Sequence, residues 1–209
     1  MTGEREDPRR GASPQPGGRP PAPGRLALVQ AFINTHYDLE EVHGAEVLSS
    51  AGALSSWLRQ AGLLDGDSRI GDPDLTRALA LREGLRALAQ AGSDTGRAAV
   101  LARERVDAVA AGGRIEVRFT AEGPRFIGAP GGGLDGAVGS LLAIVAQAMT
   151  DGSWSRLKVC PGDHCGWAFY DHSRNRSGVW CSMSVCGGRE KARAHYRRRR
   201  TGSDATWAR

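Results

Sequence analysis

The chain contains 209 residues, of which 40% are hydrophobic and 24% are charged, and this composition suffices for one ordinary domain plus a small module. No run of about 18 apolar residues is present, so we expect no membrane-spanning helix and no membrane partner. The N-terminus also lacks the apolar segment of a secretory signal. We therefore expect a cytoplasmic protein, whose cysteine thiols stay reduced.

Charge is distributed unevenly along the chain. Residues 1–155 contain 16 Lys and Arg against 19 Asp and Glu, whereas residues 156–209 contain 12 against 4. The last quarter of the chain therefore carries a formal charge of +8, and the remainder carries −3. Such an asymmetry favours a polyanionic partner for the C-terminal region.

Residues 1–24 are rich in proline and glycine. They contain six of the ten prolines and almost no large apolar side chain, so they cannot bury enough surface to offset the entropy lost on ordering. We therefore predict a disordered N-terminal tail over residues 1–24, and we treat residues 202–209 as a C-terminal tail.

Between the tails, apolar residues recur first at helical spacing and then in alternation. The helical spacing predicts helices over residues 25–41, 50–61, 73–92, 95–111 and 134–150. Ile115, Val117 and Phe119 alternate with charged residues, which is typical of a half-buried strand, and residues 125–129 should return as its partner. Residues 25–155 are therefore predicted to form a mainly α domain with a small β-hairpin, an α+β fold.

All four cysteines lie within 27 residues, in a C-x4-C-x15-C-x4-C pattern formed by Cys160, Cys165, Cys181 and Cys186. Two close pairs separated by a longer loop let two turns present two sulfurs each, and a structural zinc ion takes four such ligands in a tetrahedron. The sequence therefore predicts one structural Zn²⁺ bound by these thiolates. A disulfide framework is disfavoured in a reducing compartment, and His164 is not needed as a ligand.

The cysteines predict a zinc module over residues 156–201. Aromatic and apolar residues on both sides of the polar turn at residues 173–178 suggest a hairpin, and residues 189–197 are compatible with a helix that begins beside Cys186. A knuckle, a hairpin and a ligand at a helix start form a treble-clef-like order, in which the helix N-terminus favours the thiolate. Because so small a module has little core, metal binding should supply its stability.

The expected helix after the last cysteine has a cationic face. Arg189, Arg193, Arg197 and Arg200 recur at spacings of four, four and three, which places them on one side of a helix. Like charges at this spacing oppose helix formation, so we expect a phosphate backbone to offset their repulsion. The predicted nucleic-acid contacts are Arg174, Arg176, Arg189, Lys191, Arg193, Arg197 and Arg200.

Val185, Ala192 and Tyr196 fall on a different face of the same helix. We expect this apolar side to pack on Trp167 or Trp180.

The cysteine module closely resembles the CGNR zinc-finger family. The residues that carry the resemblance are Cys165-Gly166-Trp167, Phe169, Asp171, Ser173-Arg174-Asn175-Arg176, Trp180-Cys181-Ser182-Met183, Cys186-Gly187-Gly188-Arg189, Lys191-Ala192-Arg193 and Tyr196. The name-giving Asn of that family is Gly188 here, which leaves the metal ligands unaffected.

The upstream region resembles the ABATE domain that usually precedes this finger. The matching features are Phe32-Ile33-Asn34-Thr35, Trp57-Leu58, Gly62-Leu63-Leu64 and the run from Ala80 to Arg86. Together the two resemblances cover nearly all of residues 25–200. The family is regarded as stress-induced transcription regulators, so the resemblance implies DNA binding.

Two further motifs have competing interpretations. Gly131, Gly133 and Gly136 fit G-x-G-x-x-G, but a dinucleotide site needs a parallel βαβ unit and the strand here belongs to a predicted hairpin. The polar run from Asn34 to Tyr37 could line a ligand pocket, although local capping and core hydrogen bonding explain it more simply. We find no catalytic set of residues, and a closed four-thiolate site has no position for a catalytic water.

The sequence therefore predicts a zinc-dependent DNA-binding regulator that is not an enzyme. Its α-rich domain would sense a small-molecule effector or form a homodimer, and its finger would bind DNA. The alternative is a finger that docks onto RNA or an acidic protein partner. An enzymatic N-terminal domain that binds a small molecule is the third interpretation.

Overall fold

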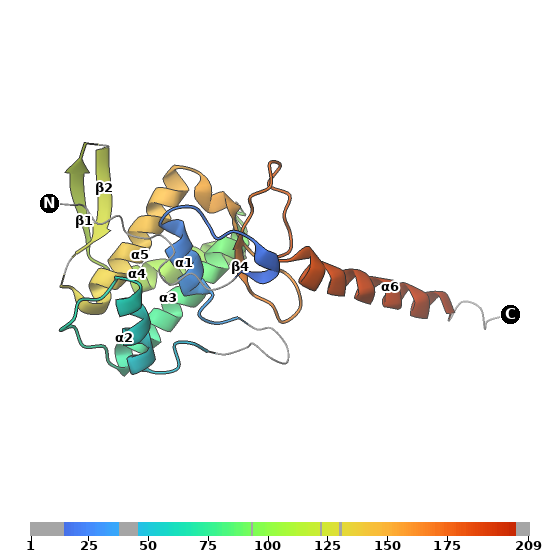
Figure 1. Ribbon diagram of the computed structural model, residues 1–209, viewed down its shortest axis with the longest axis horizontal. Coiled ribbons are helices and arrows are strands. Elements are labelled where there is room, and N and C mark those ends of the chain that lie inside the picture. The colour runs from blue at the N-terminus through green and yellow to red at the C-terminus, as the bar shows by residue number, and fades with distance from the viewer. Residues whose placement is uncertain (1–14, 38–45, 93, 122, 130, 204–209) are drawn as a thin grey trace.

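The computed structural model describes residues 15–37, 46–92, 94–121, 123–129 and 131–203, and for residues 200–203 it describes the backbone only. A helical body carries a β-hairpin at one end and the cysteine module at the other, and a long C-terminal helix projects from that module (Figure 1). The helices are α1 (Leu26–Ile33), α2 (Ala51–Gln60), α3 (Asp72–Ala91), α4 (Arg97–Ala110), α5 (Gly133–Thr150) and α6 (Gly188–Ser203). The strands are β1 (Ile115–Thr120), β2 (Gly123–Gly128), β3 (Leu157–Val159) and β4 (Ala168–Tyr170).

The helical body confirms the predicted fold class. Local signals set several boundaries: the Ser50 hydroxyl accepts a hydrogen bond from the amide of Ala53 at the start of α2, and the Asp74 carboxylate accepts one from the amide of Gly71 at the start of α3. The first helix is shorter than predicted. It ends at Ile33 rather than at residue 41, and residues 38–41 lie outside the described residues.

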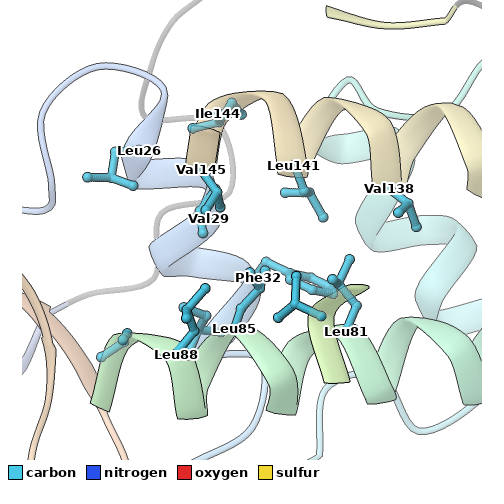
Figure 2. Close-up of a cluster of buried hydrophobic side chains, with 14 of the residues drawn as sticks. Leu26, Val29, Phe32, Leu81, Leu85, Leu88, Val138, Leu141, Ile144 and Val145 are labelled. Atoms are coloured by element: carbon cyan, nitrogen blue, oxygen red, sulfur yellow. The ribbon is translucent and has the colours of Figure 1, made fainter. Parts of the chain in front are cut away.

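The core forms where α1 lies between α3 and α5 (Figure 2). The apolar side chains of α1 contact leucines of α3 on one side and aliphatic residues of α5 on the other. Phe32, at the centre, is 1% exposed and its ring also meets Trp57 at a centroid distance of 5.5 Å. Burial of these side chains is the main stabilising contribution to the body. The labelled residues are Leu26, Val29, Phe32, Leu81, Leu85, Leu88, Val138, Leu141, Ile144 and Val145.

Glycines allow the β1–β2 hairpin to approach α5. A Cβ atom on Gly128 would lie 2.1 Å from the carbonyl oxygen of Gly136, and one on Gly139 would lie 2.1 Å from that of Arg114. Gly128 and Gly139 are therefore explained by close packing of backbone against backbone, whereas Gly131 and Gly133 at the start of α5 have positive φ values of 69° and 55°. The strands β1 and β2 are antiparallel, so the parallel unit of a dinucleotide site is not formed.

The prediction that the first strand is half-buried was wrong. All six residues of β1 are exposed, and Phe119 is 85% exposed. The alternating pattern does produce one apolar face, but none of the described residues covers that face.

Part of the predicted zinc module packs into the core of the body, while the cysteines form a second buried cluster with Trp167 and Phe169. Leu157 of β3 and Ala168 and Tyr170 of β4 belong to the same buried cluster as the helices of the body. β3 also contacts α3, and β4 contacts α1. The cysteine module is therefore packed against the body through the β3–β4 hairpin.

The prediction of a disordered tail over residues 1–24 was wrong for residues 15–24, and residues 1–14 lie outside the described residues. The guanidinium of Arg19 lies 4.9 Å from the centre of the Phe169 ring and donates to the carbonyl oxygens of Tyr170, Trp180 and Cys181. Ala22 is 4% exposed. This segment therefore packs as a strap across the cysteine module.

Within the described residues, α5 is the one helix whose length and hydropathy match those of a membrane span. However, 56% of that helix is buried inside the protein, as is usual for a central core helix.

Candidate metal centre and nucleic-acid interface

The four cysteines come together as predicted. Their sulfur atoms all lie within 4.8 Å of one another, and all four residues are buried. The distances are 3.5 Å between Cys181 and Cys186, 3.7 Å between Cys165 and Cys181, and 3.7 Å between Cys165 and Cys186. A tetrahedral zinc ion with Zn–S bonds of about 2.3 Å requires sulfur separations of about 3.8 Å. The arrangement therefore fits a zinc ion.

The first two predicted ligands, Cys160 and Cys165, occupy the turn between β3 and β4. The amide of Cys160 donates to the carbonyl oxygen of Trp167, and the amide of Cys165 donates to that of Gly162. His164 and Gly166 have φ values of 53° and 59°, which curl the chain so that both sulfurs point inward. The hairpin thus forms a knuckle, with Cys160 directly after β3.

The other two predicted ligands, Cys181 and Cys186, both precede α6. The Ser182 hydroxyl accepts a hydrogen bond from the amide of Val185 and so caps a π-helical turn, η3 (Met183–Gly187), that contains Cys186 and leads directly into α6. A thiolate at a helix N-terminus is stabilised by the helix dipole. The knuckle and the helix start match the predicted treble-clef-like module, but a loop lies between them where a hairpin was predicted.

Crowding of the four thiols affects their ionisation. Hydrogen bonds from Cys165 and Cys181 lower the pKa of Cys160 to about 2, whereas the hydrogen bond to Cys160 raises the pKa of Cys165 to about 12. The pKa of Cys181 is raised by its hydrogen bonds to the same neighbours, and the pKa of Cys186 is raised by burial. Four thiolates in so small a volume need a cation to offset their repulsion.

The hairpin predicted inside the module was wrong. β4 pairs with β3, not with the segment around Val179 and Trp180, in a register that places Leu157 opposite Tyr170 and Val159 opposite Ala168. The chain from residue 171 to 181 is a loop. The polar turn at residues 173–178 was predicted, but the pairing of strands depends on tertiary packing. The strand that pairs with β4 is β3, which precedes the first cysteine.

Asp171 organises this loop. Its side chain is fully buried, and its carboxylate accepts hydrogen bonds from the Lys158 ammonium at 2.7 Å and from the amides of Ser173 and Gly178. Burial acts to raise the pKa of Asp171, but these hydrogen bonds outweigh it and hold the pKa well below its usual range. The carboxylate therefore stays ionised and fixes both ends of the loop that presents Arg174 and Arg176.

Polar contacts connect the metal centre to the helical body. The Asn34 amide group donates to the carbonyl oxygen of Ala168 and accepts from its amide, both at 2.8 Å, so it pairs with β4 as another strand would. Arg86 of α3 donates to the carbonyl oxygens of Gly166, Ile33 and His36. These contacts support the interpretation of core hydrogen bonding at residues 34–37 over a ligand pocket.

Arg82 has a similar structural role. Its side chain is 5% exposed and forms a two-pronged ion pair with Glu46, at 2.6 and 2.7 Å. Burial acts to raise the pKa of Glu46, but the hydrogen bonds from Arg82 and from the amide of Leu48 lower it overall. Arg82 also donates to Thr35. The polar residues near the end of α1 are thus occupied by structural contacts.

The described residues form a cavity away from the cysteine cluster. It has a volume of about 280 Å³ and lies between the loop after α2 and the glycine-rich segment before α5. The Asp65 carboxylate accepts a hydrogen bond from the amide of Gly131 there.

The residues predicted to contact nucleic acid differ in their exposure and in their polar partners. Arg174, Arg189, Lys191 and Arg197 are exposed. Arg176 is exposed too, but its guanidinium lies 3.3 Å from the Ser155 hydroxyl. Arg200 belongs to α6, and its side chain lies outside the described residues.

Arg193 is more constrained than predicted. It forms ion pairs with Asp163 of the knuckle at 2.7 Å and with Glu190 at 3.1 Å, and Glu190 also lies 3.7 Å from Arg197. Acidic residues thus offset part of the charge on this face. Because Asp163 lies between the first two metal ligands, Arg193 ties α6 to the knuckle.

The apolar face expected on α6 does not pack on the finger. Tyr196 is 65% exposed and Val185 is 36% exposed. Trp167 instead contacts Tyr37, with ring centroids 4.6 Å apart, and its indole nitrogen donates to Gln15. Beyond its first turn, α6 therefore projects from the module, and its tyrosine is not packed against the finger (Figure 1).

Sequence reasoning missed the residues that fasten the module: Gln15, Arg19, Asn34 and Arg86. Asn34 was noticed as a polar residue at the end of an apolar helix, but its partner lies 134 positions away along the chain. No local pattern could have identified that partner. His164 and His172 are exposed.

Comparisons with known proteins agree with this architecture. The ABATE family model, described as "Putative stress-induced transcription regulator", matches residues 24–151. The CGNR zinc finger model matches residues 156–199, which include all four clustered cysteines. No curated protein sequence matches the chain.

Proposed function

Because the chain belongs to the ABATE family, whose model matches more than half of it, we propose that it is a zinc-dependent transcription regulator whose finger binds duplex DNA. The observation that supports this most strongly is the projection of α6 from the metal centre as an exposed, cationic helix (Figure 1). We further propose a cytoplasmic location, in which the thiols stay reduced.

The proposed metal is one structural Zn²⁺ bound by Cys160, Cys165, Cys181 and Cys186. Four thiolates complete a tetrahedral site, so no position remains for a catalytic water, and we propose no enzymatic role. The ion would join the knuckle to the start of α6 and thereby fix the direction in which that helix leaves the body.

The shape and charge of α6 suit a nucleic acid. A helix of 16 residues is about 24 Å long, and the major groove of B-DNA admits a single α-helix. Arg189 and Arg197 lie on one face and are exposed, and Lys191 and Arg198 lie on another exposed face. A helix with cations on more than one side can reach phosphates on both edges of a groove.

The loop beyond β4 gives a second contact. Asp171 fixes this loop from inside, so Arg174 and Arg176 are held on a rigid turn rather than on a free tail. We propose that these two arginines bind phosphates next to the site that α6 occupies.

The helical body supplies the regulatory half of the proposal. It would sense an effector or bring two copies together. The body is joined to the finger by Asn34 and Arg86, so a change in the body could alter the position of α6.

The experiment measures binding to duplex DNA as a function of salt concentration. In the double variant Arg189→Ala/Arg197→Ala, affinity should fall, and the slope of log K against log salt should decrease by about 0.9 for each lost phosphate contact. Arg193 is left in place because its ion pair with Asp163 belongs to the finger itself.

The matched control is Arg97→Ala/Arg105→Ala, which removes the same charge from exposed positions of α4. It should leave affinity and slope nearly unchanged. Equal affinity and slope in wild type and the α6 variant, with zinc content and fold verified, would reject DNA binding by this face. It would favour docking onto RNA or an acidic protein.

A further inference from the structure

The β1–β2 hairpin has an open edge. In the described residues β1 pairs with β2 alone, and α5 packs mainly on β2, so β1 is the outer strand (Figure 1). An unpaired strand edge presents backbone N–H and C=O groups that can pair with another chain. β1 contains no proline, whereas Pro124 removes a donor from β2. The edge suited to pairing is therefore that of β1.

One face of the hairpin is apolar and uncovered. Val117 lies directly opposite Phe126, and Phe119 lies opposite Pro124, so their side chains share a face with Ile115. The exposed fractions are 45% for Ile115, 51% for Val117, 85% for Phe119 and 44% for Phe126. A two-stranded hairpin with such a face is marginal in water without further strands.

The charges on the other face select one partner. When β1 pairs antiparallel with a second copy of itself, a residue whose backbone N–H and C=O point toward the partner lies opposite another such residue, and these residues alternate along the strand. The twofold axis therefore passes between one residue and its own copy. With the axis at residue 116 or residue 118, Glu116 or Arg118 would meet its own copy. With the axis at Val117, Glu116 of each chain meets Arg118 of the other.

We propose that the protein forms a homodimer through antiparallel pairing of β1 with β1 of a second copy, centred on Val117. The product is a four-stranded sheet in the order β2-β1-β1-β2. Its apolar face places Ile115 opposite Phe119 of the other copy. On its polar face, Arg118 lies opposite Arg125 and 3.5 Å from Glu116 of its own strand, and the dimer adds Glu116 of the second copy as a further carboxylate on the open side of Arg118.

The first measurement is the mass of the full, zinc-loaded chain by sedimentation over a range of concentrations. The wild type should show a reversible monomer–dimer equilibrium. In Glu116→Arg, two arginines meet two arginines, and in Arg118→Glu, two glutamates meet two glutamates. Each variant alone should dimerise at least about tenfold more weakly than wild type, because two favourable cross-strand pairs become unfavourable.

The decisive arm mixes the two variants. Glu116→Arg and Arg118→Glu together present opposite charges at both positions, so the mixture should form a heterodimer although neither variant dimerises well by itself. The double variant Glu116→Arg/Arg118→Glu restores complementarity within one chain and should dimerise like wild type. Recovery in these two arms separates a pairing defect from failure of the hairpin to fold.

The matched control is Arg105→Glu, which makes the same change of charge at an exposed position of α4. It should leave the dimerisation constant within about twofold, because this position takes no part in the proposed pairing of strands. A wild type that stays monomeric, a Glu116→Arg variant that dimerises like wild type, or a variant mixture that stays monomeric would overturn the proposal.

Discussion

The molecule contains two antiparallel hairpins with opposite surroundings. The β1–β2 hairpin has strands of six residues and exposes every residue of β1. The β3–β4 hairpin has strands of three residues, yet every residue of β4 is buried. Length and apolar alternation therefore do not determine which hairpin is inside. The burial of each hairpin depends on which other segments of the chain pack over it.

Several elements cover β3–β4. Asn34 pairs with the backbone of Ala168, and Arg19 lies over the ring of Phe169. The cysteine cluster closes the turn. In contrast, β1–β2 is supported mainly by α5, through glycines that bring the backbones together. One hairpin is thus an interior element, and the other is a surface element.

The largest effect should come from breaking the metal centre beneath β3–β4. In Cys181→Ser, zinc binding should be lost and the finger should unfold, because the proposed zinc ion would supply most of its stability. Since Leu157 and Tyr170 also belong to the core of the body, the thermal midpoint of the helices should fall as well. Elemental analysis and far-UV circular dichroism on heating measure the two effects.

Ser184→Ala, in the same turn, is the control for Cys181→Ser and should keep zinc bound. A Cys181→Ser protein whose helices melt at the wild-type temperature would show that the two cores are independent.

The next effect compares a phenylalanine from each hairpin. Phe169→Ala should lower the free energy of unfolding by about 3–5 kcal/mol, because its side chain is fully buried. Phe119→Ala should change it by less than about 0.5 kcal/mol in the monomer, because that side chain is 85% exposed. Urea denaturation at a low protein concentration measures both. Similar losses in the two variants would contradict the contrast between the hairpins.

A smaller effect should follow from loosening the edge of β4. In Asn34→Asp the carboxylate can still accept from the amide of Ala168 but can no longer donate to its carbonyl oxygen. Leaving that buried carbonyl without its donor should lower the free energy of unfolding by about 1–3 kcal/mol. Hydrogen exchange should show faster opening of β4, while exchange in β1 stays as in wild type. Equal acceleration in both strands would indicate global destabilisation instead.

The sequence allowed the helices and the metal ligands to be predicted because both depend on neighbours along the chain. Helical periodicity identified α2 to α5 within a few residues, and the spacing of the cysteine pairs identified a cluster whose sulfurs do meet. The matching family models cover the same two regions. α6 was also expected, because the residues after Cys186 are compatible with a helix.

Apart from the length of α1, the wrong predictions concern contacts between distant segments. The strap at residues 15–24 lacks large apolar side chains, but Arg19 finds carbonyl acceptors more than 150 positions away. The strand beside β4 proved to be β3, which precedes the knuckle. The predicted half-burial of β1 failed because no described residue covers its apolar face.

By itself, then, the sequence determined the helical class, the clustering of the four cysteines and the cationic character of the last helix, since short-range spacing and charge are written directly in the order of residues. The tertiary structure alone decided which hairpin is buried, that β3 and β4 pack into the core of the body, and that Arg193 is paired while α6 projects. Those outcomes depend on the burial of surfaces and the pairing of polar groups between segments far apart in the chain, and neither can be read from local pattern.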